Sequence, residues 1–188
     1  PADDAQKIDW RASLRAGELL MREFIEERNL NVVLLIDVGD SMIFGSKDKL
    51  KCEDAAEVAA NIAFAVLKVG DSLGYILHSD KPVARMSPKI GNVQFFMLSK
   101  ELLDPDTYGG GFSLEKASKS LLTFLHQRSV VIIISDFTNV DEGWDSALKT
   151  MAAKYDIIGL MIRDPRDRRM PKSGLPVMSL ILKSGTLM

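Results

Sequence analysis

The sequence contains few of the features that mark specialised classes of protein. Its single cysteine, Cys52, excludes an internal disulfide framework and a cysteine-based zinc site, and a reducing compartment is the simpler expectation. No apolar run approaches the roughly 18 residues that cross a bilayer, so this sequence predicts no membrane span. The formal net charge is only −2, and binding to nucleic acid or to an anionic membrane is not expected.

The composition is that of an ordinary globular protein, with 46% hydrophobic and 27% charged residues. A chain of 188 residues buries roughly 70% of its unfolded surface in one core, which predicts a single domain. The chain begins with Pro1 and lacks the charged-then-apolar pattern of a signal peptide. We therefore expect a cytoplasmic piece of a longer protein, in which a missing N-terminal part has room for a membrane anchor.

Hydrophobic patterns predict strands that alternate with helices. Blocks rich in Val and Ile have the continuous apolar character of parallel strands that are buried on both faces. The expected strands are 32–36, 130–134 and 157–162, with 72–77 as a weaker candidate, and the expected helices are 53–69, 92–103, 113–127 and 144–154. The apolar stripe expected for the first of these helices is Val58, Ile62, Ala65, Val66 and Val69. This alternation predicts an α/β sandwich.

The two ends of the chain carry weaker signals. Residues 1–30 are expected to form an N-terminal segment that packs on the core through Ile8 and Trp10, and 31–188 to form the domain itself. Within the first part, 18–28 is either a helix or an extended segment.

Three further segments complete the predicted elements. The segment 81–87 is a candidate edge strand, because proline is tolerated at sheet edges. Near the end, 163–172 is expected to be a loop and 177–182 a last strand.

Two carboxylates directly follow predicted strands. Asp37 ends the first strand and Asp136 follows the strand 130–134. The carboxyl ends of parallel strands form ligand sites in open α/β sheets, above all where the strand order reverses. Ser41 brings a hydroxyl toward the same point if the chain turns after Asp37, and such oxygens suit a hard divalent ion. On spacing alone, both carboxylates are equally consistent with caps of the turns that follow.

Other polar residues favour structural interpretations. His78 and His126 have no evident partner, and nothing in the sequence assembles them into a catalytic triad. The glycines at 109–111 indicate a tight loop, because no P-loop lysine follows them. Ser113 is well placed to cap the helix that begins after it.

Short motifs run through nearly the whole chain. They are KIDWRAS at 7–13 with Arg15, Glu26-Glu27-Arg28, Ser41-Met42 with Phe44-Gly45, Gly70-Asp71, Ser135-Asp136-Phe137, and Asp164-Pro165 with Asp167, Pro171 and Gly174. In this order they resemble the bacterial and archaeal domain-of-unknown-function family 58, within the von Willebrand factor A-like fold. The resemblance implies a three-layer α/β sandwich with a mostly parallel central sheet and helices on both faces.

The same resemblance implies a metal-ion-dependent adhesion site. In that fold, an Asp-x-Ser-x-Ser loop, a later Thr and a later Asp hold the ion. Asp37, Ser41 and Asp136 match this pattern, whereas Gly39 replaces the first Ser and Phe112 stands at the Thr position. The resemblance therefore implies a degenerate site in which these three matching residues are the candidate ligands of Mg²⁺ or Mn²⁺.

The function implied by the resemblance is that of a non-enzymatic protein-interaction module. Its partner-binding rim consists of Gly39, Asp40, Phe112 and Ser113, with Phe112 as an anchor if it is exposed. The resemblance also implies that the domain acts as an adaptor for a MoxR-type AAA+ ATPase. The alternative is a Mg-dependent hydrolase acting on a phosphate ester, which needs a general base that the sequence does not reveal. A structural spacer in a membrane-anchored protein is a third reading.

Overall fold

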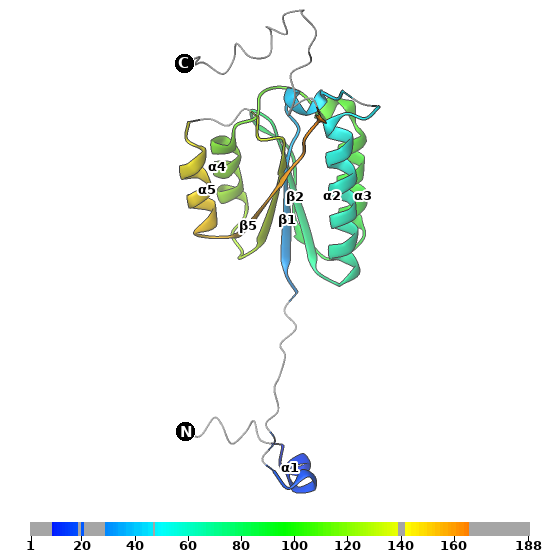
Figure 1. The fold of residues 1–188 in the computed structure, drawn as a ribbon, viewed down its shortest axis with the longest axis vertical. Coiled ribbons are helices and arrows are strands. Elements are labelled where there is room, and N and C mark those ends of the chain that lie inside the picture. Colours follow the sequence, from blue (N-terminus) through cyan, green and yellow to red (C-terminus); the bar gives the residue numbers. More distant parts are fainter. Residues whose placement is uncertain (1–8, 19, 21–28, 47, 139–141, 166–188) are drawn as a thin grey trace, which may run out of the picture.

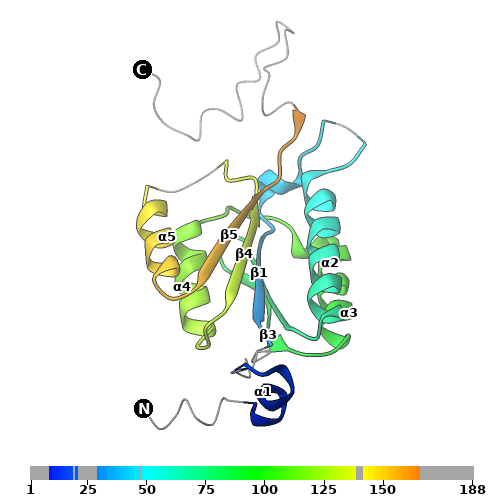
Figure 2. The same ribbon diagram turned by 60° about the horizontal axis from the view of Figure 1, so that its bottom comes forward.

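The computed structural model describes residues 9–18, 20, 29–46, 48–138 and 142–165. Within them the chain forms one five-stranded sheet with helices on both faces (Figure 1 and Figure 2). The strands are β1 (Asn31–Asp37), β2 (Ser72–His78), β3 (Pro82–Lys89), β4 (Val130–Ser135) and β5 (Asp156–Met161). The helices are α1 (Trp10–Ala16), α2 (Lys51–Lys68), α3 (Val93–Leu103), α4 (Leu114–Phe124) and α5 (Trp144–Ala152), with 3-10 turns η2 (Asp40–Ile43) and η3 (Pro105–Thr107).

The sheet has the strand order β3-β2-β1-β4-β5. Four strands are parallel, and β3 pairs with β2 in antiparallel orientation at one edge. The connection from β2 to β3 is short enough for a hairpin and too short for a crossover, whereas crossovers with helices join the parallel strands. The predicted α/β sandwich with a mostly parallel sheet is therefore confirmed, and β3 confirms the edge strand expected near 81–87.

The helices form two layers around the sheet. Helices α2 and α3 cover one face, and α4 and α5 cover the other (Figure 1). Successive residues of β1 point to opposite layers: Leu34 and Ile36 belong to the core on the α2 side, and Val33 and Leu35 to the core on the α4 side. Because β1 is central and buried on both faces, it needs apolar residues at every position, which explains the unbroken Val and Leu run.

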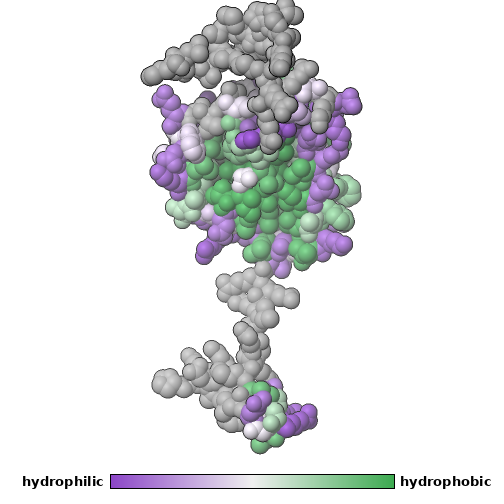
Figure 3. Space-filling model, in the orientation of Figure 1, coloured by the Kyte–Doolittle hydropathy of each residue, from purple (hydrophilic) through white to green (hydrophobic). Residues whose placement is uncertain are grey.

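Strand β5 differs from the sequence prediction. The block 157–162 was expected to be buried on both faces, but Ile158 is 47% exposed and Met161 is 48% exposed. This expectation is wrong because β5 is the outermost parallel strand of the described sheet. In the view where β5 faces the reader, Figure 3 shows a broad hydrophobic area at the centre of the molecule. An apolar run indicates a strand, but the strand order decides how much of it is covered.

The buried stripe of α2 also differs from the predicted one. Val69 is 73% exposed and Ala65 is exposed, so the expected stripe is wrong at these two positions. The residues that the helix buries most fully are Lys51, Cys52, Ala55, Ala59 and Ala63. Small side chains let α2 lie close to the sheet, and the larger Val58, Ile62 and Val66 pack beside that line of contact. The stripe runs directly into Lys51 at the start of the helix.

The N-terminal segment is described in part. Helix α1 begins after Asp9, whose carboxylate accepts a 3.1 Å hydrogen bond from Ala12 N, and it ends at Gly17 with a φ of 71°. Ile8 and the side chain of Trp10 lie outside the described residues, so the packing of 1–30 on the core stays a prediction.

Other expectations fall partly or wholly on the same undescribed parts of the chain. They include the state of 18–28, most of the loop 163–172 and the strand at 177–182. Among the described helices, none combines the length and the apolar character needed to cross a membrane.

Candidate functional site

The candidate site lies at the carboxyl ends of β1 and β4, which are parallel neighbours. Ile36 pairs with Ile134 in the register, so the next residues, Asp37 and Ser135, reach the same level of the sheet. From β1, the sheet continues to β2 on one side and to β4 on the other, so the strand order reverses at this point. Open α/β sheets build their ligand sites in this crevice.

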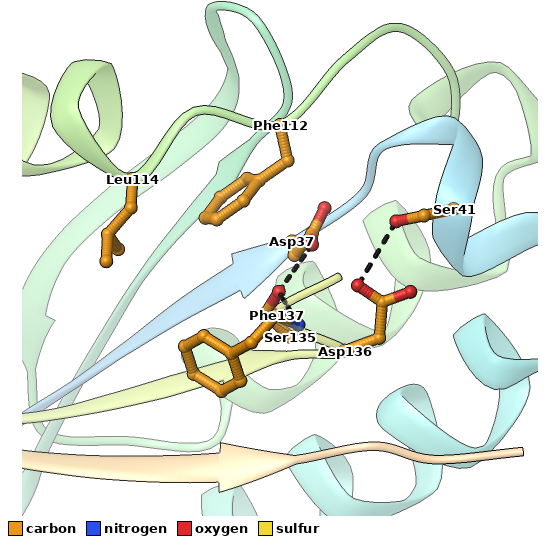
Figure 4. Close-up of a pocket in the computed structure, with 7 residues that line it drawn as sticks. All are labelled: Asp37, Ser41, Phe112, Leu114, Ser135, Asp136 and Phe137. Carbon is orange, nitrogen blue, oxygen red and sulfur yellow. Dashed lines mark hydrogen bonds between the residues drawn. The ribbon is translucent and has the colours of Figure 1, made fainter. Parts of the chain in front are cut away.

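Asp37 is held by two hydrogen bonds at the end of β1. Its Oδ2 accepts a 2.6 Å bond from Ser135 Oγ (Figure 4). Its Oδ1 accepts a 2.8 Å bond from Gly39 N. Burial raises the pKa of Asp37 to about 6, although the bonds from Ser135 and Gly39 and the charge of Lys51 oppose that shift. The nearby charge of Asp136 adds to it.

Asp136 has a different environment from Asp37. Its Oδ1 accepts hydrogen bonds from Ser41 Oγ at 3.3 Å, from Thr138 N at 3.1 Å and from Thr138 Oγ1 at 2.9 Å. Burial acts to raise the pKa of Asp136, but the hydrogen bonds from Lys51 and Thr138 outweigh it and lower the pKa. The chain turns here through Phe137, whose φ of 51° is uncommon for an aromatic residue.

Lys51 is the cation of the site. Its Nζ lies 2.6 Å from Asp136 Oδ2, and the side chains of the two residues are 5% and 2% exposed. The ammonium also lies 5.7 Å from the centre of the Phe44 ring, within the range of a cation–π contact. Lys51 N donates to Phe44 O at 2.9 Å, which fixes the start of α2 against the preceding loop. The ion pair thus joins α2 to the end of β4.

The first loop and the glycine loop are fastened to one another. Asp40 N donates to Gly110 O at 2.7 Å, and Gly110 N donates to Asp40 Oδ1 at 3.0 Å. A Cβ at Gly39 would lie 3.1 Å from Asp37 Oδ1 and 3.1 Å from Gly110 O, closer than most real contacts. A serine at position 39 therefore does not fit this loop without a shift of its neighbours, and the Asp40 carboxylate serves the contact between loops.

Phe112 and Ser113 lie on the other side of Asp37. Phe112 is only half-exposed, since its ring meets the buried His78 ring edge-on, with centroids 6.2 Å apart. The Ser113 hydroxyl accepts a 3.2 Å hydrogen bond from Lys116 N and so caps α4, as predicted.

His78 has a structural environment. Its Nδ1 lies 2.6 Å from Ser79 O and its Nε2 3.2 Å from Ser120 Oγ. Burial lowers the pKa of His78. These contacts are those of a core histidine that joins β2 to α4.

A small cavity of about 10 Å³ remains between these groups (Figure 4). Its lining consists of Asp37, Ser41, Phe112, Leu114, Ser135, Asp136 and Phe137. This space suits about one water molecule. The structure thus brings Asp37, Ser41 and Asp136 together, as predicted, and each Asp also caps a turn through the backbone N–H two residues later. The two readings that spacing left open are compatible.

Comparison with known proteins decides the family. The family described as "Protein of unknown function DUF58" matches residues 1–182. The chain belongs to the DUF58 family. This confirms the resemblance carried by the short motifs along the sequence.

The relatives of this DUF58 chain are themselves uncharacterised. Uncharacterized protein Rv1480 of Mycobacterium tuberculosis is 28% identical over 176 residues, which cover 93% of this chain and 55% of that protein. Uncharacterized protein YeaD of Bacillus subtilis is 34% identical over 74 residues, which cover 39% of this chain and 17% of that protein. The DUF58 chain thus spans about half the length of the first of these relatives.

Solved structures share the fold of this DUF58 domain. An aerotolerance-related membrane protein from Bacteroides fragilis has a TM-score of 0.57 at 16% identity, over 71% of this chain and 68% of that one. The conserved hypothetical protein BatB from Bacteroides thetaiotaomicron has a TM-score of 0.55 at 17% identity, over 71% and 66% of the two chains. At these identities the likeness concerns the fold alone, and it agrees with the α/β sandwich described above.

The donor set of the DUF58 site fits a divalent ion poorly. All four carboxylate oxygens of Asp37 and Asp136 already accept hydrogen bonds. No buried side-chain nitrogen or oxygen among the described residues lacks a partner. Mg²⁺ held by Asp37, Ser41 and Asp136 needs several waters to complete its octahedron, and the cavity has room for about one.

Three residues of the DUF58 site were missed by sequence reasoning. Ser135 was part of a family motif but was given no role, and Thr138 was not considered. Lys51 was given no role either. The available signal was its helical spacing, because Lys51 precedes Ala55 by four residues and so shares a face with the buried alanines.

Proposed function

We propose that this DUF58 domain is a non-enzymatic protein-interaction module whose partner-binding rim consists of Gly39, Asp40, Phe112 and Ser113. The observation that carries the proposal is the rigid construction of this rim. Two hydrogen bonds between Asp40 and Gly110 hold its loops together. A rim that is fixed before binding loses little conformational entropy when a partner docks, so it suits recognition.

The proposed partner is a MoxR-type AAA+ ATPase, for which the domain acts as an adaptor. The support for this partner is membership of the family, whose members the resemblance associates with such ATPases. The contact surface is proposed to extend from the rim over the exposed side chains of Ile43 and Phe44, which are 44% and 37% exposed. Phe112 is only partly exposed and is therefore not a fully exposed anchor.

The alternative of a Mg-dependent phosphate ester hydrolase has less support. Such an enzyme needs carboxylates that are free to hold the ion and a base that activates water. Here Asp136 is paired with Lys51, and Asp37 accepts bonds from Ser135 and Gly39. Turnover of a generic phosphate ester that is lost in Asp37→Ala would support the hydrolase and contradict the adaptor proposal.

The proposal is tested by co-purification with a MoxR-type ATPase from the same organism. Gly111→Arg is the probe, because Gly111 is exposed at the rim and a Cβ there meets nothing within 4 Å. Ala65→Arg is the matched control, since it adds the same charge at an exposed position near the far end of α2. We expect wild type and Ala65→Arg to retain the ATPase and Gly111→Arg to lose it. Equal recovery of the ATPase by all three would contradict the proposal.

A further inference from the structure

From the geometry we infer that the Lys51 ammonium is the resident cation of this site and that the domain works without a divalent metal ion. The inference goes beyond the proposed function, because it concerns which cation offsets the negative charge of the two buried carboxylates. It holds for any protein partner. It rests on four observations: the position of Lys51, the hydrogen bonds that the carboxylate oxygens accept, the charge of the cluster and the size of the cavity.

The position of Lys51 is unusual for a lysine. It is the first residue of α2, where the positive end of the helix dipole disfavours a cation. It is also 5% exposed, although lysine is almost never buried unless it is paired. Both costs are offset by Asp136 Oδ2 at 2.6 Å. The side chain is therefore placed where the carboxylate needs a positive charge.

The oxygen atoms around the site already take part in hydrogen bonds. Ser41 and Ser135, whose hydroxyl oxygens are potential ligands, donate to Asp136 and Asp37 respectively. Asp136 Oδ1 accepts two further hydrogen bonds from Thr138. Each of these donors competes with an entering ion for the lone pairs of the two carboxylates.

The charge of the cluster also disfavours a second cation. The Lys51 ammonium offsets the charge of Asp136, and Asp37 is the other carboxylate among the described residues that line the cavity. A divalent ion beside Asp37 would stand close to the buried ammonium, in a region where water screens the repulsion weakly. The cavity of about 10 Å³ leaves no room for a shell of water molecules that would screen the repulsion between the two cations.

The test compares wild type with Lys51→Met, which keeps the length of the side chain and removes its charge. Binding of Mn²⁺ is followed by electron paramagnetic resonance, and the melting temperature is measured with Mg²⁺, with Mn²⁺ and with EDTA. For wild type we expect no Mn²⁺ binding and no change in melting temperature at millimolar ion. For Lys51→Met we expect at least tenfold tighter Mn²⁺ binding than wild type and a melting temperature that rises with ion.

Two outcomes would overturn the inference. One is binding of Mn²⁺ by wild type at or below millimolar concentration, and the other is a folded Lys51→Met that gains no affinity for the ion. If Lys51→Met does not fold in EDTA, it is refolded in millimolar Mg²⁺, where rescue supports the inference and failure contradicts it. Lys51→Arg keeps the positive charge and is expected not to bind Mn²⁺. Binding of Mn²⁺ by this variant would also contradict the inference.

Discussion

Ser135 Oγ donates a 2.6 Å hydrogen bond to Asp37 Oδ2, across 98 positions of sequence. The bond joins the ends of β1 and β4 at the point where the strand order reverses. It shows directly that the strand ends carrying Asp37 and Asp136 form one site. Its energetic role can be measured separately from any partner.

Ser135→Ala is expected to destabilise the domain by about 1–3 kcal/mol, because the buried Asp37 carboxylate loses a donor that nothing else replaces. The measurement is the free energy of unfolding in urea. Ser146→Ala is the matched control, since Ser146 is exposed on α5, and its effect is expected within about 0.5 kcal/mol. Equal stability of the two variants would show that the bond contributes nothing.

Asp37→Asn is expected to change how stability depends on pH. Burial is the largest cause that raises the pKa of Asp37 from 3.8 to about 6. Unfolding therefore releases a proton at pH values between about 4 and 6. The contribution of Asp37 to stability is therefore complete below about pH 4 and is lost as the pH rises through about 6. This loss amounts to about 3 kcal/mol.

The check on Asp37 is a series of urea unfolding curves from pH 4 to pH 7 in EDTA. Wild type is expected to lose stability relative to Asp37→Asn over this range, and the variant is expected to be at least as stable at pH 7. Parallel pH profiles for the two proteins would mean that Asp37 titrates normally.

Asp136→Asn is expected to cost about 3–5 kcal/mol, because it removes the negative charge that lies 2.6 Å from the buried Lys51 ammonium. Thermal and urea unfolding measure the loss. Asp145→Asn provides the control, since it breaks an exposed pair between Asp145 and Lys149, with side chains 60% and 75% exposed, and is expected to cost less than about 0.5 kcal/mol. Comparable losses in both variants would contradict the distinction between a buried and a surface pair.

Gly39→Ala and Gly111→Ala separate the two loops of the rim. A Cβ at Gly39 meets Asp37 Oδ1 and Gly110 O at 3.1 Å, so about 1–3 kcal/mol of destabilisation is expected. A Cβ at Gly111 meets nothing within 4 Å, and its effect is expected within about 0.5 kcal/mol. Differential scanning calorimetry of both variants checks the contrast, and a neutral Gly39→Ala would show that the loops adjust freely.

Much of the fold follows from local pattern. Unbroken apolar runs identify β1 and β4 because both faces of a central parallel strand are covered, and the position of Asp37 and Asp136 after these runs predicts that they meet. The exposure of β5 could not be predicted, because it depends on which strand lies at the edge of the described sheet.

The electrostatics of the site were harder to predict than its location. Lys51 and Asp136 are 85 positions apart, and a lysine at the start of a helix normally faces solvent. The role of Asp40 depends on the backbone of Gly110, which no side-chain pattern reveals. In both cases the decisive partner comes from a distant loop or helix.

Binding of a protein partner by the rim is tested by a measurement of affinity. The purified MoxR-type ATPase is immobilised, and the dissociation constants of wild type, Ala65→Arg and Gly111→Arg are measured by biolayer interferometry. We expect equal affinity for wild type and Ala65→Arg and at least tenfold weaker binding by Gly111→Arg. No binding by wild type, or equal binding by Gly111→Arg, would contradict the proposal.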